Sequence, residues 1–327
     1  MDETNMSGAA RIKGVIKGMG NNLSLLIALA IMWVVLSFLS PYFFSVDNIM
    51  NILLLCSVVL IRASGATIAM ITGGLDISQN SLGAVTGVVV AMLSVNLGAP
   101  FWLMVIVTIA LGVGMGAFNA LLISFFKINP IITTLGTMQV YRGIAWLLSD
   151  KSIMMRDPLM TTMGRGRLFG ILPISVLIAI GFFALAVFIL KYTTYGRKVY
   201  MVGGNEKASY LSGLDAKMVK FWAYVISAIS ASLAGFLLAG QVGTALPQSG
   251  SGTEMMTIAA IILGGLSLAG GKGSMWGTLL GILVLSTVSN GLTLLSVNAY
   301  VQMVVTGAIL ILAVLLDVLR SGELKKK

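Results

Sequence analysis

The chain has 327 residues, of which 57% are apolar and only 10% are charged. Ordinary soluble domains carry about a quarter charged residues, so a soluble fold could not bury this much apolar surface. The single cysteine, Cys56, excludes an intrachain disulfide, and without histidine the chain offers no imidazole for metal binding or catalysis. The net charge of +10 comes from residues beside apolar segments, which indicates membrane orientation rather than a nucleic-acid surface.

Long uncharged stretches predict helices that cross a bilayer. Fifty uncharged residues separate Asp76 from Lys127, and forty-four separate Lys272 from Asp317. One spanning helix needs about 20 apolar residues, so each stretch holds two spans. We predict an all-α integral membrane protein, a polytopic bundle of about ten transmembrane helices. The expected spans are residues 23–40, 49–72, 77–95, 101–124, 130–149, 172–190, 221–241, 255–270, 275–295 and 301–319.

The basic residues predict the orientation of these spans, because Lys and Arg are retained on the cytoplasmic side. With the N-terminus inside, fifteen of the 21 fall on cytoplasmic segments and four fall in one external loop. Both termini are therefore expected in the cytoplasm. The expected parts are an N-terminal tail (1–20), a transmembrane domain (21–320) with one sizeable cytoplasmic loop (191–220), and a basic C-terminal tail (321–327).

The cytoplasmic loop 191–220 carries the signals of a short helix. Asn205 is a favourable N-cap, and Glu206 would lie in the first turn, where the helix dipole favours an acid. Gly213 is a plausible helix stop. We expect a helix of about two turns on the cytoplasmic surface.

No segment of the chain matches a phosphate-binding loop. GGLSLAGGKGS at 264–274 is rich in glycine, but Lys272 is followed by Gly273 where the pattern needs Ser or Thr. Energy for any transport must therefore come from a partner protein or from an ion gradient. No cofactor is expected in this chain, and nothing in it resembles an enzyme site.

An ion gradient would need ionisable residues inside the membrane, and few are present. Asp76 lies between spans two and three, and Glu254 lies at the external edge of span eight. Arg62 falls near the middle of span two. A buried arginine there could form a structural ion pair, line a cavity, or show that the span is misplaced. The absence of a series of intramembrane acids argues against a proton relay.

Two glycine pairs occur in similar contexts, GGLDI at 73–77 and GGLSL at 264–268. Such pairs can mark helices that are broken around a substrate path, or they can be tight turns that look alike. Other polar residues inside the spans include Asn119, Asn129, Gln139 and Asn290. Each could line a path, and each could equally join two helices by a hydrogen bond.

Five segments, in this order, carry a resemblance to a known family. They are SPYFFSVDNIMNIL (40–53), ITGGLDISQNSLGA (71–84), PIITTLGTMQVYRGIAW (130–146), YGRKVYMVGGNEKASYLSGLD (195–215) and AAIILGGLSLAGGKGSMWGTLLG (259–281). The chain resembles the permeases of ribose-type ABC importers, within the branched-chain amino acid and ribose permease family. The resemblance implies a second permease copy or sister permease around a central path. It also implies separate ATPase subunits that bind ATP and Mg, and a solute-binding protein that delivers a monosaccharide.

The resemblance also implies roles for particular residues. The coupling helix that contacts the ATPase would comprise Gly203, Gly204, Asn205, Glu206, Ser209, Leu211, Ser212 and Gly213. Apart from the resemblance, polar and charged residues in and between the spans are candidates for the translocation path, namely Arg62, Asp76, Ser78, Asn80, Asn129, Gln139, Arg142, Asn290 and Gln302.

Two residues depart from the family pattern. The motif usually reads Asp-Leu-Ser-Val-Gly-Ser, whereas Asn80 replaces its glycine here, and Arg62 stands where relatives carry a small or apolar residue. The sequence therefore does not identify the solute, and nucleosides, autoinducer-2 and branched-chain amino acids are alternatives to a monosaccharide. A secondary transporter or facilitator that works alone is the competing function.

Overall fold

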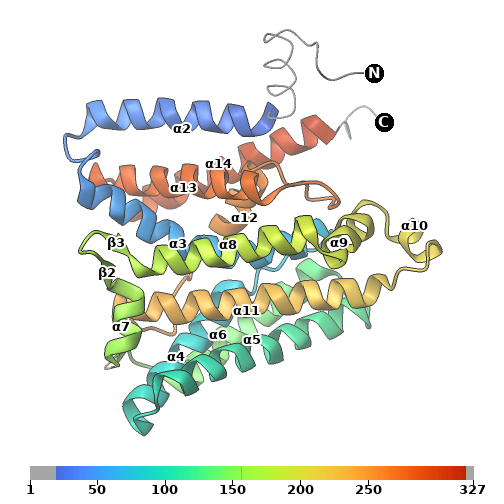
Figure 1. Cartoon of the computed structure of the whole chain (residues 1–327), viewed down its shortest axis with the longest axis horizontal. Coiled ribbons are helices and arrows are strands. Elements are labelled where there is room, and N and C mark those ends of the chain that lie inside the picture. Colours follow the sequence, from blue (N-terminus) through green and yellow to red (C-terminus); the bar gives the residue numbers. More distant parts are fainter. Residues whose placement is uncertain (1–19, 156, 322–327) are drawn as a thin grey trace.

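The computed structural model describes residues 20–155 and 157–321, and within them the chain is a bundle of long helices. Figure 1 shows these helices lying side by side along one direction. They are α2 (Gly20–Leu39), α3 (Val46–Ile71), α4 (Gln79–Leu97), α5 (Phe101–Ser124), α6 (Pro130–Leu148), α8 (Ile174–Tyr192), α11 (Ala216–Val242), α13 (Met275–Leu294) and α14 (Ala299–Ser321). This arrangement confirms the predicted all-α membrane fold.

Four shorter helices and two small sheets complete the described chain. The helices are α7 (Pro158–Arg165), α9 (Thr194–Gly204), α10 (Glu206–Leu211) and α12 (Glu254–Leu263). β1 (Ile153–Met154) pairs antiparallel with β4 (Thr244–Ala245), and β2 (Arg167–Leu168) pairs antiparallel with β3 (Leu172–Pro173). These strands and α7 lie at one end of the bundle, whereas α9 and α10 lie at the other (Figure 1).

Seven described helices are long and apolar enough to cross a membrane, namely α2, α3, α4, α5, α8, α11 and α13. α6 has 19 residues but includes three threonines, a glutamine, a tyrosine and Arg142. α12 and the apolar part of α14 are shorter than a full span.

The expected eighth span at 255–270 is wrong in its extent. Helix α12 ends at Leu263, and residues 264–274 form an irregular segment. Gly265 adopts a left-handed φ of 87°, which ends the helix. Gly264 also packs so closely on Gly277 of α13 that a side chain could not fit. The sequence did not indicate this break, because the segment has the high apolar content of a membrane span.

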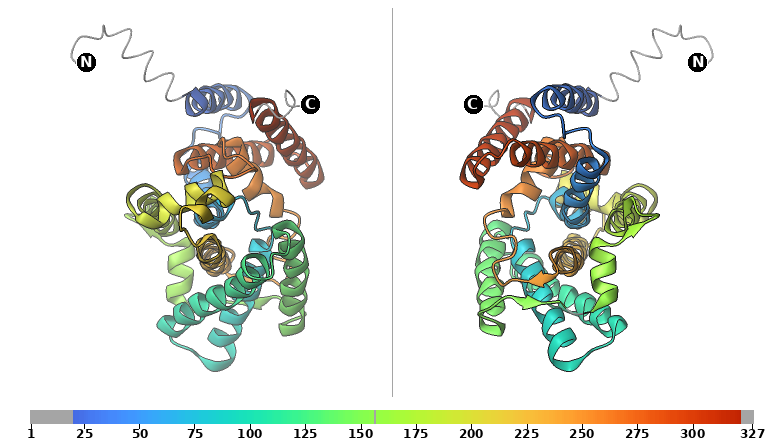
Figure 2. Two further views of the ribbon diagram at one scale, coloured as in Figure 1. Left: turned by 90° about the vertical axis from the view of Figure 1, so that its right-hand side faces the viewer. Right: turned by 90° about the vertical axis from the view of Figure 1, so that its left-hand side faces the viewer.

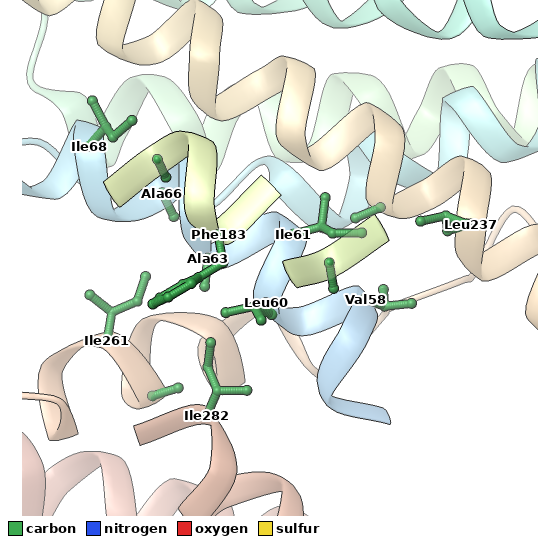
Figure 3. Close-up of a cluster of buried hydrophobic side chains, with 14 of the residues drawn as sticks. Val58, Leu60, Ile61, Ala63, Ala66, Ile68, Phe183, Leu237, Ile261 and Ile282 are labelled. Carbon is green, nitrogen blue, oxygen red and sulfur yellow. The ribbon is translucent and has the colours of Figure 1, made fainter. Parts of the chain in front are cut away.

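Helices α3 and α11 form the centre of the bundle. Viewed along the helices, α11 lies inside, with α2, α13 and α14 on one side and α4, α5 and α6 on the other (Figure 2). Side chains of α3 such as Ile61 contact Phe183 of α8, Leu237 of α11 and the α12–α13 pair in one apolar core (Figure 3). Glycine lets these helices approach closely, because a Cβ on Gly112 or Gly116 of α5 would collide with α11.

Candidate functional site: two glycine connections, a surface helix and a buried charge cluster

The first helix break holds a buried carboxylate in a network of hydrogen bonds. Residues 72–78 connect α3 to α4 without helical structure, and Asp76 is only 3% exposed. Its Oδ1 accepts bonds from the Ser78 backbone N at 3.1 Å and from Ser78 Oγ at 2.6 Å. Its Oδ2 accepts a 2.7 Å bond from Ser227 Oγ of α11. Three donors thus compensate the carboxylate for the hydration that it loses on burial.

Neighbouring helices extend this network. Asn119 of α5 donates to Ser78 Oγ at 2.9 Å, and Tyr141 of α6 donates to Asn119 Oδ1 at 3.2 Å. Gln79 donates to Ser227 Oγ at 2.8 Å. The network therefore joins the start of α4 to α5, α6 and α11. Such complete bonding holds the break rigidly in place.

The second helix break lies directly against the first. In the 264–274 segment, Gly271 N donates a 2.8 Å bond to the Ile71 carbonyl, the last residue of α3. The Tyr200 hydroxyl of α9 donates to the Gly273 carbonyl at 3.0 Å. Burial raises the pKa of the Tyr200 hydroxyl further above neutral pH. The two glycine pairs singled out in the sequence thus lie in two irregular connections, each between antiparallel helices, and these connections meet.

A third glycine segment joins this meeting point, which we call the glycine junction (residues 71–73, 203–204 and 270–271). The backbone of Gly203 packs against the Ile71 carbonyl and against Gly271, with no room for a Cβ. Gly271 itself, at a φ of 70°, packs on Gly204. The end of α9 is therefore in direct backbone contact with both helix breaks.

The surface helix expected in the cytoplasmic loop is present as α10, which confirms that prediction. Asn205 caps it, with Oδ1 accepting a 2.9 Å bond from Ala208 N, and Gly213 ends the turn at a φ of 79°. Glu206 in the first turn forms a 2.6 Å ion pair with Lys220 of α11. Leu211 is 85% exposed although it is apolar. Helix α9, which precedes it and is capped by Thr193, was not anticipated.

A charge cluster lies at the other end of the bundle, under a connection that we call the strap (residues 246–253). Arg142 of α6 donates to the Pro247 carbonyl at 2.7 Å and to the Ser249 carbonyl at 2.8 Å. It also forms a 3.6 Å ion pair with Glu254, the first residue of α12. Asn80 donates to the Gly250 carbonyl at 2.7 Å. Two helices thus hold the strap by side-chain bonds to its backbone.

Arg62 lies beneath the strap. It is 6% exposed and lines a small cavity with Asn80, Ser249 and Gly250. Two residues singled out as departures from a family pattern, on separate helices, thus share one cavity.

Comparisons with known proteins identify the family. A family model described as the permease component of a branched-chain amino acid transport system matches residues 48–314. The chain belongs to this permease family. The ribose import permease protein RbsC of Escherichia coli (strain K12) is 38% identical over 297 residues, which cover 89% of this chain and 92% of that protein.

Other similar proteins are also named as sugar permeases. The D-allose transport system permease of E. coli K12 is 34% identical over 90% of both chains. The L-arabinose transport system permease of the same strain is 33% identical over 96% of this permease and 95% of that protein. No solved structure matches this permease.

Among the described residues, no hydrogen bond joins the remaining path candidates of the permease to the Asp76 network or to the charge cluster. Asn129 is exposed and caps α6, accepting a 2.9 Å bond from Ile131 N, and Gln139 is exposed on the same helix. Asn290 of α13 exchanges two bonds with Asn48 of α3, at 2.9 and 3.1 Å. Gln302 bonds locally to the Val297 carbonyl at 3.0 Å. Helix capping thus accounts for Asn129, helix pairing for Asn290 and a local bond for Gln302.

Several residues that matter in the permease were absent from the predicted site. Ser227 and Tyr141 complete the Asp76 network, and Glu254 completes the charge cluster. A signal existed for Glu254, since it is a lone charge next to an apolar run. Serine and tyrosine are common in membrane helices, so only the contacts of Ser227 and Tyr141 show that they belong to the Asp76 network.

Proposed function

We propose that the chain is the permease subunit of an ATP-driven importer and forms the translocation path for a monosaccharide. Family membership supports a transport subunit rather than an enzyme. Permeases named for ribose, allose and arabinose match along nearly the whole chain, which supports a sugar as the solute. The contact of the surface helices with both helix breaks is the structural observation that carries the proposal.

Under this proposal, α10 is the coupling helix on which a separate ATPase acts. Tyr210 is 75% exposed and Leu211 is 85% exposed, so α10 presents an apolar tip away from the bundle (Figure 1). A displacement of this tip by the ATPase would move α9. Helix α9 would in turn displace the glycine junction, where the three segments are in backbone contact. Packed elements of this kind move as rigid bodies and need no nucleotide site of their own. ATP and Mg would be bound by the partner subunits.

The permease would span the bacterial inner membrane ten times, with both termini in the cytoplasm. The start of α2, the end of α14 and the α9–α10 unit lie at one end of the bundle in Figure 1. Fifteen of the 21 basic residues belong to segments expected at that end. Helix α6, the α12 segment and α14 would supply the three crossings beyond the seven long apolar helices.

The path would form between this chain and a second permease copy or a sister permease, with lipid around the pair. A solute-binding protein would dock on the opposite face, where α7 and the strap lie. The exposed apolar side chains on α2, α5 and α14 include Phe38, Trp102 and Val304, and they suit contact with lipid or with that second copy.

Purification of the permease from its native membrane, followed by identification of any ATPase that is retained with it, tests the proposal. We expect Leu211→Asp to lose the ATPase and to abolish sugar uptake, because a charge would replace the apolar tip. Leu159→Asp, at an exposed apolar position of α7 on the other end, is the matched control for ATPase binding and should still co-purify with the ATPase. Solute accumulation by vesicles that hold the permease without any ATPase would instead show a secondary transporter.

A further inference from the structure

Arg62 is a buried cation without a bonded partner among the described residues. Its Nε has no hydrogen-bond partner there, and its guanidinium forms no ion pair there. It lies near the middle of α3, a helix that is buried along most of its length. An unpaired charge at this depth in a membrane protein is costly, and it normally faces a solute or ion pathway.

The charges around Arg62 do not balance. Glu254 is the acid that acts electrostatically on Arg62, but its ion pair is with Arg142. The other acid at this depth, Asp76, is engaged by Ser78 and Ser227. Two guanidinium groups therefore share one carboxylate, and the cluster lacks one negative charge.

The cavity at Arg62 is closed by the strap. Its volume of about 10 Å³ holds at most one water molecule. Residues Leu246, Ser249 and Gly250 form the wall on the strap side. Gly250 and Gly252 have left-handed φ values of 73° and 81°, and the strap is held by a few bonds from Arg142 and Asn80. Release of those bonds would open the cavity toward the end of the bundle where a solute would enter.

We propose that Arg62 binds the carboxylate of the transported solute, which makes the solute an acidic monosaccharide such as an aldonate. The inference rests on the proposed function. A carboxylate supplies the missing negative charge, and its two oxygens match the paired N–H groups on the Nε edge of a guanidinium. The unpartnered Nε belongs to that edge.

The test uses the whole permease in nanodiscs of phosphatidylcholine, which carries no anionic headgroup. Sodium D-ribonate and D-ribose are titrated at constant ionic strength, and the shift in Tm is followed. We expect ribonate to stabilise the wild type more than ribose does. Arg62→Met should weaken the ribonate response by about tenfold or more, since a charge-assisted hydrogen bond is lost. Lys151→Met, which removes an exposed charge at the same end, should respond like the wild type.

Two further measurements distinguish a loss of ribonate binding from misfolding of the variant and from a failure of the proposed function. Arg62→Met should unfold at the same temperature as the wild type or higher, because it removes an unpaired buried charge. The wild type and the variant should co-purify equally with the ATPase, which tests the proposed function separately. An equal ribonate response in wild type and Arg62→Met, or no response in either, would overturn the assignment.

Discussion

At the scale of single residues, the buried polar groups of this permease are of two kinds. Asp76 accepts hydrogen bonds from two segments, through Ser78 and Ser227, and these bonds offset part of the cost of its burial. Arg62 has no such compensation among the described residues. The bonding of Asp76 is typical of a side chain that stabilises the fold. The unbonded guanidinium of Arg62 is typical of a side chain that binds a ligand.

The Asp76 network yields a prediction about stability. Asp76→Ala removes the acceptor for three hydrogen bonds and leaves buried donors on Ser78 and Ser227. We expect it to lower the free energy of unfolding by about 1–3 kcal/mol, measured by denaturant titration in detergent micelles. Asp47→Ala is the control, because its ion pair with Arg167 is at the surface and is worth about 0–1 kcal/mol. Equal effects of the two substitutions would contradict the structural role of Asp76.

At the scale of elements, the glycine junction explains why three glycine segments far apart in the chain lie together. The end of α3, the end of α9 and the 264–274 segment touch through their backbones. Backbone contact is stiffer than contact through long side chains, so under the proposed function a displacement of α9 would be passed to both helix breaks.

The junction predicts different effects for two adjacent glycines. Gly203→Ala places a methyl group against the Ile71 carbonyl, and we expect it to cost about 1–3 kcal/mol of stability and to reduce uptake strongly. Gly204→Ala has open space at its Cβ and should retain uptake. Uptake of labelled sugar into cells that express each variant at equal levels makes the comparison. If Gly203→Ala were as active as Gly204→Ala, the junction would not transmit movement.

At the scale of the whole molecule, the helices alternate in direction so that most basic residues of the described chain reach one end. Under the proposed function, retention of Lys and Arg in the cytoplasm would place that end inside the cell. The α9–α10 unit projects from this end, and the strap with its charge cluster lies at the other (Figure 1).

This orientation can be measured with cysteine labelling. In a Cys56→Ala background, Lys207→Cys on α10 should react with a membrane-impermeant maleimide only in inside-out vesicles. Lys151→Cys, in the connection before β1, should react only in intact cells freed of their outer membrane. Both positions are exposed, so access depends on the side of the membrane. Labelling of both from the same side would rule out the proposed topology.

The sequence by itself determined the class of the protein, most of its helices and the surface helix at 206–211. These features depend on local physics, namely apolar runs long enough for a bilayer and a capping residue followed by a left-handed glycine. The break after Leu263 was missed because an apolar segment looks alike whether it is a helix or a buried turn. Only the tertiary structure decided that Asn290 pairs with Asn48, that the three glycine segments meet, and that Arg62 lies beside Asn80 without a bonded partner among the described residues. Those facts depend on contacts between residues far apart in the chain, and no local pattern encodes which distant segment fills the space beside a given side chain.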